Sequence, residues 1–540
     1  MDAPPPLPAR AARLAALEGA AVDVAVVGGG ITGAGVALDL RLRGLEVALL
    51  EAGDWASHTS SASSRLVHGG LRYLEQLEIG LVRESCLERA LLLRNAAGLV
   101  WPEHFVFPVR RTDRVGRVKL AAGLWLYTLL STPRALGLPG LVSRAGVRRW
   151  LPDVRLDALK GGGTYLDAAT DDARLTLAVV LSAIRAGATC LSRTEVTAVE
   201  TAEGGARLAL LDALDGSERA LSARAVVLAG GPGTEALRGR AGLAGRWLSP
   251  TRGSHVLVPR RRLPTEGAVI FPSHLDGRVM FLIPWPRYTV IGTTDLNAEP
   301  DVPPRATREE VRYLLESANG LTRGVDLTEA DVVSTWSGLR PLLAAPEDDP
   351  SARSREERVA VEGPVFTIAG GKLTGYRSMA EKLGAQVAQA LGKGDASRRS
   401  PTRSHALWGA LPRPVTRPAW STPGHPGDVL EYALNRRYGR LARVVRDHCR
   451  YAPGAGRELD PETLLGELDW ALTHEDCLRP ADFFLRRTDL GYGPRELADA
   501  SVEPVLDRMG RALDWGEAEF DAARAELDEE LDRRHAWTED

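Results

Sequence analysis

Cysteine is scarce in this chain, with only 4 among 540 residues. The four positions, Cys86, Cys190, Cys449 and Cys477, lie far apart, and no two of them form a C-x-x-C pair. Zinc sites, iron–sulfur sites and disulfide frameworks need closely spaced or numerous cysteines. The spacing therefore argues against those classes, predicts no metal site and favours the reducing cytosol as the location of the protein.

Long apolar runs are also absent. No stretch reaches the roughly 18 apolar residues that a membrane-spanning helix needs. The N-terminal segment lacks the continuous apolar region of a secretory signal and combines a proline-rich start with an Ala/Leu/Arg pattern. We therefore expect a chain that stays inside the cell, with a short surface helix near its N-terminus.

The chain also has no excess of positive charge, since its 68 Lys and Arg residues and 71 Asp and Glu residues give a net charge of −3. This balance excludes a globally basic nucleic-acid binder, so any recognition of anions has to be local. A length of 540 residues is too great for one core and predicts two or three domains. The content of 44% hydrophobic and 26% charged residues is ordinary for a globular protein.

The strongest positive signal is a glycine motif near the N-terminus. Residues 23–33 read Asp-Val-Ala-Val-Val-Gly-Gly-Gly-Ile-Thr-Gly, and residues 47–51 read Val-Ala-Leu-Leu-Glu. This order of strand, glycine turn, helix, strand and acid is typical of a dinucleotide site. Gly28 permits the tight turn, Gly30 lets the backbone approach a pyrophosphate, and Gly33 lets the helix pack on the strand. The alternative is a glycine-rich turn without a ligand.

A hydroxyl-dense loop follows Glu51, the acid that would accept a hydrogen bond from the ribose of the nucleotide. Residues 55–74 read Trp-Ala-Ser-His-Thr-Ser-Ser-Ala-Ser-Ser-Arg-Leu-Val-His-Gly-Gly-Leu-Arg-Tyr-Leu. Clustered hydroxyl and backbone N–H groups suit the second phosphate and the ribityl chain of a bound flavin, which a dissociable nicotinamide does not require. The alternative is a solvated serine-rich linker.

Five ordered blocks make the sequence similar to a known family. The blocks are Ser63–Glu75, Gly253–Pro259, Ile283–Trp285 with Ile291–Asp295, Ser337–Leu342 and Gly370–Arg377. In this order they resemble the FAD-dependent glycerol-3-phosphate dehydrogenases, which are respiratory, quinone-linked enzymes. The resemblance extends from about Val22 to Arg377, with a weaker similarity near residues 479–488. It implies FAD as the cofactor, oxidation of sn-glycerol 3-phosphate to dihydroxyacetone phosphate, and transfer of electrons to a membrane quinone.

The order of the motifs predicts an α/β protein with three parts: a Rossmann-like FAD-binding domain, an antiparallel-sheet substrate domain and a C-terminal helical domain. The predicted ranges are 20–100, 165–248 and 334–392 for a discontinuous FAD-binding domain, 101–164 and 249–333 for the substrate-binding domain, and 418–540 for the helical domain. The C-terminal helices could cap the substrate domain, form a homodimer surface or contact another partner, and the sequence leaves these alternatives open.

The cofactor contacts follow from the motifs together with the resemblance. The predicted FAD-binding residues are Gly28, Gly30, Gly33, Glu51, Thr59, Ser60, Ser61, Ser64, Arg65, Leu66, His68, Gly69, Val196, Gly231, Lys372, Leu373 and Thr374. Lys372 stands at the start of a predicted helix whose N-terminus carries partial positive charge. Such a terminus stabilises the negative charge of a reduced flavin, so Lys372 is also a predicted catalytic residue.

Hydride transfer from a secondary alcohol requires a base for the hydroxyl proton and an aligned carbinol hydrogen. His255 and His68 lie in the matched blocks, and an imidazole pKa near 6.5 suits a base at neutral pH. Of these two residues, His255 is the predicted base, and His68 is predicted to lie against the flavin.

A phosphorylated polyol also needs cations to hold its dianionic phosphate. The predicted phosphate- and carbinol-positioning residues are Arg72, Arg340 and Arg355, because guanidinium groups bind phosphate oxygens in pairs and stay charged when desolvated. Arg340 stands within an apolar segment where an unpaired cation would be costly. Arg355 lies in a charged loop where Arg353 or Arg358 could serve instead, and the Tyr73 hydroxyl could contact the same phosphate.

Two departures from the family pattern leave other functions open. Residues 228–233 read Leu-Ala-Gly-Gly-Pro-Gly where relatives read Asn-Ala-Thr-Gly-Pro-Trp, and Gly375 replaces a threonine. One alternative is an oxidase of the same fold that uses dioxygen, acting on glycerol phosphate or on an amine. Another is a non-catalytic flavin-binding regulatory protein, although the retained histidines, arginines and lysine argue against it.

One segment of the sequence is relevant to the transfer of electrons from the flavin to a membrane quinone. Residues 114–130 combine basic residues with an apolar run that contains Trp and Tyr, which is typical of a helix lying in a membrane interface. A core helix with a charged end explains the same composition equally well. We expect peripheral attachment to the cytoplasmic face of the membrane.

Overall fold

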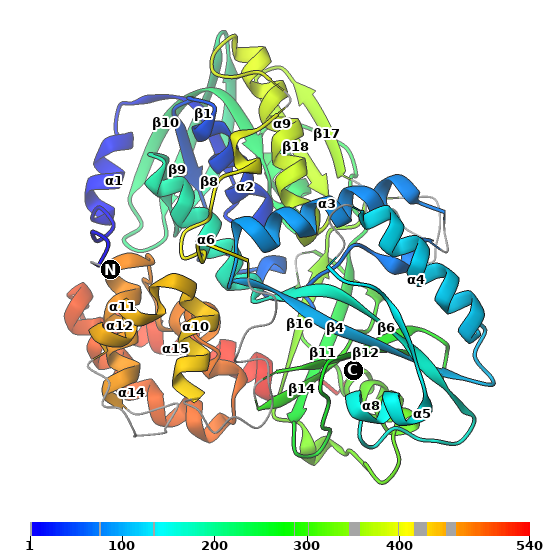
Figure 1. The fold of residues 1–540 in the computed structure, drawn as a ribbon. Coiled ribbons are helices and arrows are strands. Elements are labelled where there is room, and N and C mark those ends of the chain that lie inside the picture. Colours follow the sequence, from blue (N-terminus) through cyan, green and yellow to red (C-terminus); the bar gives the residue numbers. More distant parts are fainter. Residues whose placement is uncertain are drawn as a thin grey trace.

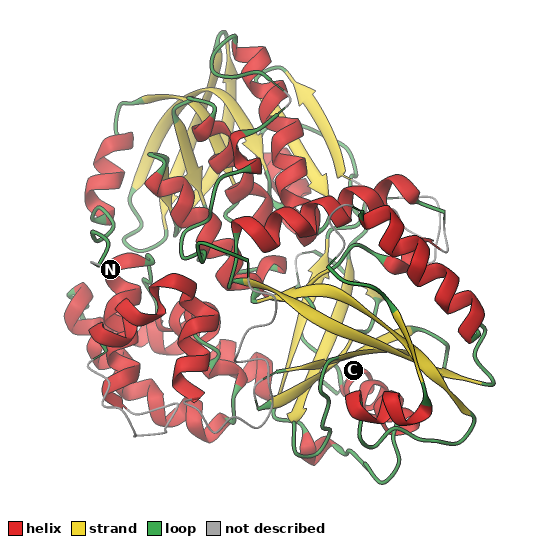
Figure 2. Ribbon diagram, in the orientation of Figure 1, coloured by secondary structure: helices red, strands yellow, loops and turns green. Residues whose placement is uncertain are grey.

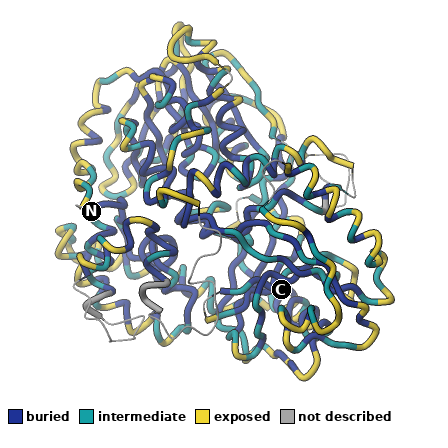
Figure 3. Tube along the Cα trace, in the orientation of Figure 1, coloured by how far each residue is buried: buried dark blue, intermediate teal, exposed yellow. Residues whose placement is uncertain are grey.

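The computed structural model describes residues 3–74, 77–132, 136–285, 287–300, 302–344, 357–397, 399–414, 429–449 and 461–539. It has three parts: a parallel sheet with helices, a second and mainly antiparallel sheet, and a group of C-terminal helices (Figure 1). The tube is dark blue over the central strands of both sheets in Figure 3, so the core of each part is built on its sheet.

The first sheet has the order β17-β18-β10-β1-β2-β7, and its strands from β18 to β7 are parallel. The strands are β1 (Ala21–Val27), β2 (Val47–Leu50), β7 (Thr189–Leu191), β10 (Glu218–Leu228), β18 (Val365–Gly370) and β17 (Glu357–Glu362), with β8 (Thr194–Ala202) and β9 (Gly205–Asp212) extending from β10. Residues 22–27 of β1 are buried, as expected for a parallel strand covered on both faces.

Helices cover the first sheet on one face and a hairpin covers part of the other. One face packs against α2 (Ile31–Leu42), α6 (Asp172–Arg185) and α9 (Tyr376–Leu391). The opposite face packs against α1 (Arg10–Leu17), α7 (Thr234–Arg240) and the β8–β9 hairpin. The α/β class with a Rossmann-like domain, predicted from the glycine motif, is confirmed.

The second sheet has the order β15-β11-β14-β13-β12-β4-β6-β3, with β16 beside β11 and β5 beside β6. Its strands are β3 (Leu66–Val67), β4 (Val100–Arg110), β5 (Gly140–Val142), β6 (Leu159–Thr170), β11 (Thr251–Pro259), β12 (Ala268–Pro272), β13 (Val279–Pro284), β14 (Tyr288–Gly292), β15 (Leu296–Asn297) and β16 (Ser334–Arg340). Its pairs are antiparallel except β12–β4. One face packs against α5 (Arg144–Trp150) and α8 (Arg308–Leu321).

The place of β16 differs from the sequence-based grouping, which put residues 334–392 with the FAD-binding domain. β16 pairs with β11 over seven residues, from Ser334 opposite Leu257 to Arg340 opposite Thr251. The main chain of 334–340 therefore continues the antiparallel ladder of the second sheet, and the chain returns to the first sheet only at β17. β3 likewise leaves the first part to pair with β6.

The C-terminal helices form a separate group at the lower left of Figure 1, and Figure 2 shows this part as helical. They are α10 (Val429–Tyr438), α11 (Ala442–His448), α12 (Pro461–His474), α13 (Pro480–Asp482), α14 (Arg495–Leu513) and α15 (Glu517–His535). α12, α14 and α15 share one apolar cluster with the second sheet. The predicted helical character of the tail is confirmed.

Two helices extend from the other edge of the molecule, α3 (Ile79–Asn95) and α4 (Arg117–Ser131) (Figure 1). α4 buries Leu120, Leu124 and Tyr127 against the second sheet, but its outer face exposes apolar side chains. These are Val118, Trp125, Leu126 and Leu129, at 85%, 55%, 42% and 68% exposure. Within the described ranges, no helix combines the length and apolarity that a membrane crossing requires.

Buried ion pairs join the C-terminal helices to the first part. The Asp54 carboxylate follows β2 and is fully buried. It accepts hydrogen bonds from Arg487 Nη2 at 2.8 Å and from the Arg486 guanidinium. A buried charge is tolerated when it is paired and hydrogen-bonded, and removing one partner leaves the other uncompensated.

We expect Asp54→Asn to lower the free energy of unfolding by about 3–5 kcal/mol, because the change removes the carboxylate that Arg487 and Arg486 share in a buried site. Denaturant titration of the FAD-loaded protein measures this loss. The matched control is Asp521→Asn on the exposed face of α15, which should change the free energy by less than about 0.5 kcal/mol. Equal stability of the two variants would contradict this account of the junction.

Candidate active site

The glycine turn after β1 has the geometry of a dinucleotide site. Gly28 has φ 116°, in the region that favours glycine, and a Cβ there would overlap the Ala229 carbonyl. A Cβ at Gly33 would overlap the Gly28 carbonyl, so α2 crosses the turn in close contact. The N-terminus of α2 therefore faces the carboxyl end of the sheet, where nucleotide phosphates bind.

Glu51 and Ser60 converge on this turn. The Glu51 carboxylate accepts from the Gly29 N–H at 2.5 Å and from the Gly53 N–H at 2.7 Å. Ser60 Oγ accepts from the Ile31 N–H at 2.9 Å, at the start of α2. The predicted ribose acid and one predicted loop hydroxyl therefore lie beside the glycine turn, which fits the adenosine diphosphate end of FAD.

The hydroxyl-dense loop then runs from the first sheet to the second. Thr59 Oγ1 donates to the Leu339 carbonyl at 2.6 Å, and Ser61 Oγ donates to the His58 carbonyl at 3.3 Å. Ser64 Oγ lies 2.8 Å from His255 Nε2. The loop therefore joins the two predicted binding regions, as a cofactor that spans both domains requires.

His255 lies at the centre of the second region. It is buried in β11, with 2% exposure, and its ring stacks on Trp336 at 4.8 Å between centroids and 12° between planes. Nδ1 has no hydrogen-bond partner among the described residues. Burial, followed by the positive charges of Arg340 and Arg65, lowers the pKa of His255 to about 3. The imidazole is therefore neutral throughout the physiological range.

Arg340 lies on the adjacent strand, at the end of β16. It donates to Asp295 Oδ1 at 2.7 Å and to Thr293 Oγ1 at 3.0 Å. A Cβ at Gly253 of β11 would overlap the guanidinium group, so this glycine provides the space in which the group lies. The side chain keeps 21% exposure, so the cation is held in place while part of it stays accessible.

Lys372 lies where the sequence block Ser63–Glu75, which contains His68, meets the block Gly370–Arg377. Its Nζ lies 4.0 Å from the centre of the Tyr73 ring and 3.4 Å from Ser85 Oγ. Thr374 Oγ1 donates to the His68 carbonyl at 3.3 Å. Lys372 directly precedes the 3₁₀ turn η6 (Leu373–Gly375), which leads into α9. The two blocks therefore meet in space, although about 300 residues separate them in the sequence.

Other predicted cofactor residues have structural partners. Arg65 is buried and pairs with Asp171 at 3.1 Å and with Asp489 at 3.2 Å. The Val196 carbonyl in β8 accepts from Arg240 at 2.7 Å, and the Gly69 N–H donates to the Tyr127 hydroxyl at 2.9 Å. Leu66 lies in β3, and Gly231 follows β10 with φ 55°. The Arg65 side chain therefore links the parts of the protein through its ion pairs. A cofactor contact from this residue would come from its main chain.

Two predicted substrate residues are not fully placed. Arg355 lies outside the described residues. Arg72 belongs to the 3₁₀ turn η2 (Leu71–Leu74), but only its main chain is described. Their roles stay predictions from the sequence.

The structure adds residues that the sequence reasoning missed. Thr293 and Asp295 hold the Arg340 guanidinium, and Trp336 supports the His255 ring. All three residues lie in or next to the sequence blocks that carry the family resemblance. The blocks therefore include these residues, although no local pattern assigns a role to any of them. Tyr492, which packs against Trp336, lies in the C-terminal part, and nothing in its local sequence indicates this contact.

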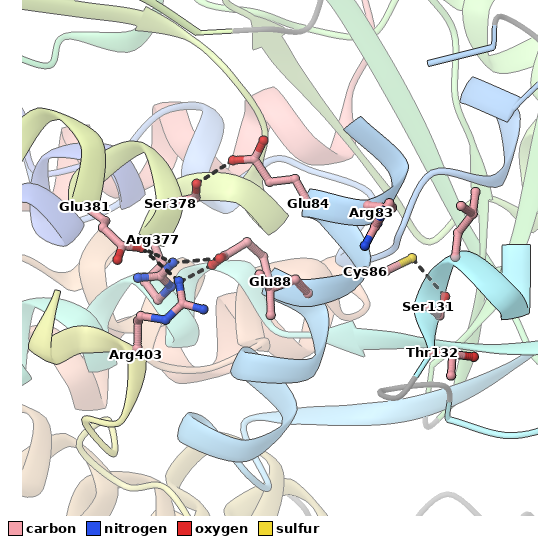
Figure 4. A pocket seen from close by; sticks show the side chains of 12 residues that line it. Arg83, Glu84, Cys86, Glu88, Ser131, Thr132, Arg377, Ser378, Glu381 and Arg403 are labelled. Atoms are coloured by element: carbon pink, nitrogen blue, oxygen red, sulfur yellow. Dashed lines mark hydrogen bonds and ion pairs between the residues drawn. The ribbon is translucent and has the colours of Figure 1, made fainter. Parts of the chain in front are cut away.

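A cavity of about 350 Å³ lies apart from these groups, between α3, the end of α4 and the start of α9 (Figure 4). Arg377 crosses its wall and pairs with Glu88 at 2.7 Å and with Glu381 at 2.6 Å. None of the predicted catalytic or cofactor residues lines it. Arg377, Glu88, Glu381 and Arg403 in its wall pair with one another.

Comparison with known proteins agrees with the geometry. The profile of the FAD dependent oxidoreductase family matches residues 23–379, and that of the C-terminal domain of alpha-glycerophosphate oxidase matches residues 371–520. The chain therefore belongs to the FAD-dependent oxidoreductases.

Individual relatives indicate which FAD-dependent oxidoreductases this chain is similar to. The chain is 33% identical over 526 residues to the aerobic glycerol-3-phosphate dehydrogenase of Staphylococcus epidermidis, with 94% of each chain covered. It is 34% identical over 510 residues to that of Bacillus subtilis, with 92% of each covered. A glycerol-3-phosphate dehydrogenase from Bacillus halodurans, solved in complex with FAD, superposes with a TM-score of 0.77 at 30% identity over 98% of each chain. The chain is a member of the FAD-dependent glycerol-3-phosphate dehydrogenase family, and the predicted resemblance is confirmed.

We expect Arg340→Gln to raise the pKa of His255, because it removes the larger of the two positive-charge effects that disfavour the imidazolium. NMR titration of histidine ring signals in the FAD-loaded protein measures this pKa, with His255→Asn identifying the signal. The wild-type signal should not titrate between pH 5 and 8, and Arg312→Gln on the exposed face of α8 should leave it unchanged.

The same shift affects stability. The unfolded chain protonates His255 near its usual pKa of 6.5, whereas the folded protein resists protonation down to about 3. The contribution of His255 to the free energy of unfolding is therefore fully present above about pH 6.5 and is lost as pH falls below it. A wild-type His255 that titrates near pH 6.5 in the folded state would contradict this explanation of the shift.

Proposed function

We propose that this protein oxidises sn-glycerol 3-phosphate to dihydroxyacetone phosphate, with FAD as the hydride acceptor and a membrane quinone as the final electron acceptor. The proposal rests on one observation: the neutral, buried His255 and the cation Arg340, which Asp295 holds in place, lie on two strands that pair with each other. The names of the relatives supply the substrate, and this pair supplies the chemistry that the substrate needs.

His255 takes the proton of the substrate hydroxyl. We assign the proton to Nε2, the ring nitrogen that already faces a hydroxyl group, that of Ser64. FAD, held by the glycine turn and the hydroxyl-dense loop, would supply the hydride acceptor, so that the carbinol carbon would lose a hydride while its oxygen loses the proton to His255 and becomes a carbonyl.

Substrate binding strengthens this base. The positive charge of Arg340 lowers the pKa of His255 in the free protein. A dianionic phosphate next to Arg340 offsets that charge, so the pKa of His255 rises when the substrate is in place. The base therefore becomes most effective when the hydroxyl proton is there to be taken.

The phosphate is held by cations from both parts of the protein. Arg340 comes from the second sheet, and Lys372 comes from the start of α9 in the first part. Tyr73 lies beside Lys372 and can add its hydroxyl. Arg72 and Arg355 remain predicted members of this group.

The alternative functions are weaker. An oxidase is not favoured, because the relatives that match over more than nine-tenths of the chain are dehydrogenases. An amine substrate offers no anion to Arg340 and Lys372. A non-catalytic flavoprotein would not need these two cations and His255 in their present positions.

Anaerobic addition of sn-glycerol 3-phosphate should bleach the yellow flavin band of the FAD-loaded protein. His255→Asn should lower the limiting rate of bleaching by about 10²- to 10⁴-fold because the base is lost, with little change in substrate Kd. Stopped-flow absorbance measures both quantities, and His274→Asn at an exposed turn is the control. A flavin that stays yellow while FAD is bound would reject this substrate, and fast peroxide formation in air would point to the oxidase.

The membrane part of the proposal rests on α4. Its outer face exposes Val118, Trp125, Leu126 and Leu129, and residues 114–132 carry Arg114, Arg117 and Lys119 without a single acid. A core helix would bury that face. The combination of an exposed apolar stripe and basic residues fits an anionic phospholipid surface, where the Trp ring and the aliphatic side chains enter the interface. Attachment here would leave the protein peripheral, on the cytoplasmic face.

The FAD-loaded protein should sediment with phosphatidylglycerol vesicles at low salt and less so at high salt. Replacing Trp125 and Leu129 with serine should lower the partition coefficient at least about tenfold, because each apolar side chain contributes roughly 1.5–3 kcal/mol when buried. Leu275→Ser, at another exposed apolar position, is the matched control. Absence of wild-type binding at low salt, or equal loss in the control, would exclude α4 as the attachment site.

A further inference from the structure

A short segment of the C-terminal helical part lies close to the reaction site. Residues 489–492 include the 3₁₀ turn η11 (Leu490–Tyr492), and this turn docks on β16 of the second sheet. Ser334 Oγ donates to the Tyr492 carbonyl at 2.7 Å. The His535 ring, at the end of α15, lies between the carbonyl oxygens of Val333 and Gly491, at 3.1 and 3.2 Å from its two nitrogens. The segment is therefore fixed to the strand that carries Trp336 and Arg340.

Tyr492 controls the surface on which His255 rests. Its ring is 1% exposed and meets Trp336 edge to face, at 5.7 Å and 83°, and Trp285 in the same way, at 6.0 Å and 75°. Trp336 in turn stacks on His255 with nearly parallel planes. The edge of Tyr492 therefore fixes the plane of the indole, and the indole fixes the plane of the imidazole.

Asp489 is linked to the same histidine through Arg65 and Ser64. It pairs with Arg65, whose guanidinium lies 4.2 Å from the centre of the Trp285 ring. Arg65 has φ 57°, a left-handed conformation that is uncommon for a residue with a side chain, so the surrounding contacts have to hold it. The preceding residue, Ser64, contacts His255 Nε2. The ion pair at Asp489 therefore helps to fix the hydroxyl that faces the base.

We propose that Tyr492 and Asp489 are positioning residues for His255, so that the C-terminal helical part completes the reaction site. This inference rests on the proposed function, in which His255 is the base. Tyr492 acts through Trp336 on the ring plane, and Asp489 acts through Arg65 and Ser64 on the Nε2 side. Arg340 contacts Asp295 and Lys372 contacts Tyr73, so we expect changes at Tyr492 and Asp489 to affect substrate affinity less than the rate.

Stopped-flow reduction of the FAD-loaded, full-length protein by sn-glycerol 3-phosphate tests the proposal. Tyr492→Leu removes the ring edge and should lower the limiting rate about 10- to 100-fold, because a misplaced base loses alignment. Substrate Kd should change less than about threefold. Tyr492→Phe keeps the ring and should restore the wild-type rate. Phe484→Leu, which removes a buried ring in the same part, is the matched control and should keep the limiting rate.

A double-mutant cycle gives the decisive readout. In the His255→Asn background, Tyr492→Leu should slow reduction no further, since it acts through the missing base. Additive slowing in that background, or slowing by Phe484→Leu equal to that by Tyr492→Leu, would overturn the proposal and leave only a structural role. Should Tyr492→Leu fail to fold, Asp489→Asn keeps the shape of the side chain and should show the same loss of rate without loss of affinity. A wild-type protein that is not reduced at all would instead reject the proposed function.

Discussion

The buried ion pairs between the C-terminal helices and the two sheets are the constraint on which the reaction site depends. Asp54 holds Arg486 and Arg487, Arg174 holds Glu475 through two bonds of 2.7 Å, and Asp489 holds Arg65. The pairs at Asp54 and Arg174 are shielded from water, so they tolerate little displacement before a partner is left unpaired, whereas the Asp489 side chain keeps 31% exposure. The helical part is therefore held in one orientation, and the groups that it contributes are fixed relative to the base.

The site is assembled from segments that are far apart in the sequence, and each supplies one chemical property. The first sheet and the glycine turn supply the end of α2 for the nucleotide phosphates. The second sheet supplies a neutral imidazole on β11 and a guanidinium on β16, side by side because these strands are paired. The start of α9 supplies a lysine, and α4 presents the exposed apolar face that we propose attaches to the membrane. In the proposed mechanism the electrostatics are coupled, since burial and the charge of Arg340, which would hold the phosphate, together keep His255 unprotonated.

Much of this arrangement could be predicted from the sequence, and the part that could not has a physical reason. The glycine motif is a local signal, because the positive φ of Gly28 and the close helix crossing at Gly33 require glycine in any fold of this kind. The helical pattern of Glu517–His535 is local as well. In contrast, β16 was grouped with the wrong sheet, since strand pairing depends on a partner some 80 residues away and not on the composition of the strand itself. The contact of Tyr492 with Trp336 is another long-range consequence of packing that no local pattern encodes.

The position of Tyr492 in the chain has a consequence for biosynthesis. A ribosome has to make 492 of the 540 residues before the aromatic partner of Trp336 exists, and α15 with its His535 contact follows later still. The nucleotide-binding turn, by contrast, is encoded within the first tenth of the sequence. The nascent protein therefore gains the turn that holds the cofactor well before the segment that we propose aligns His255.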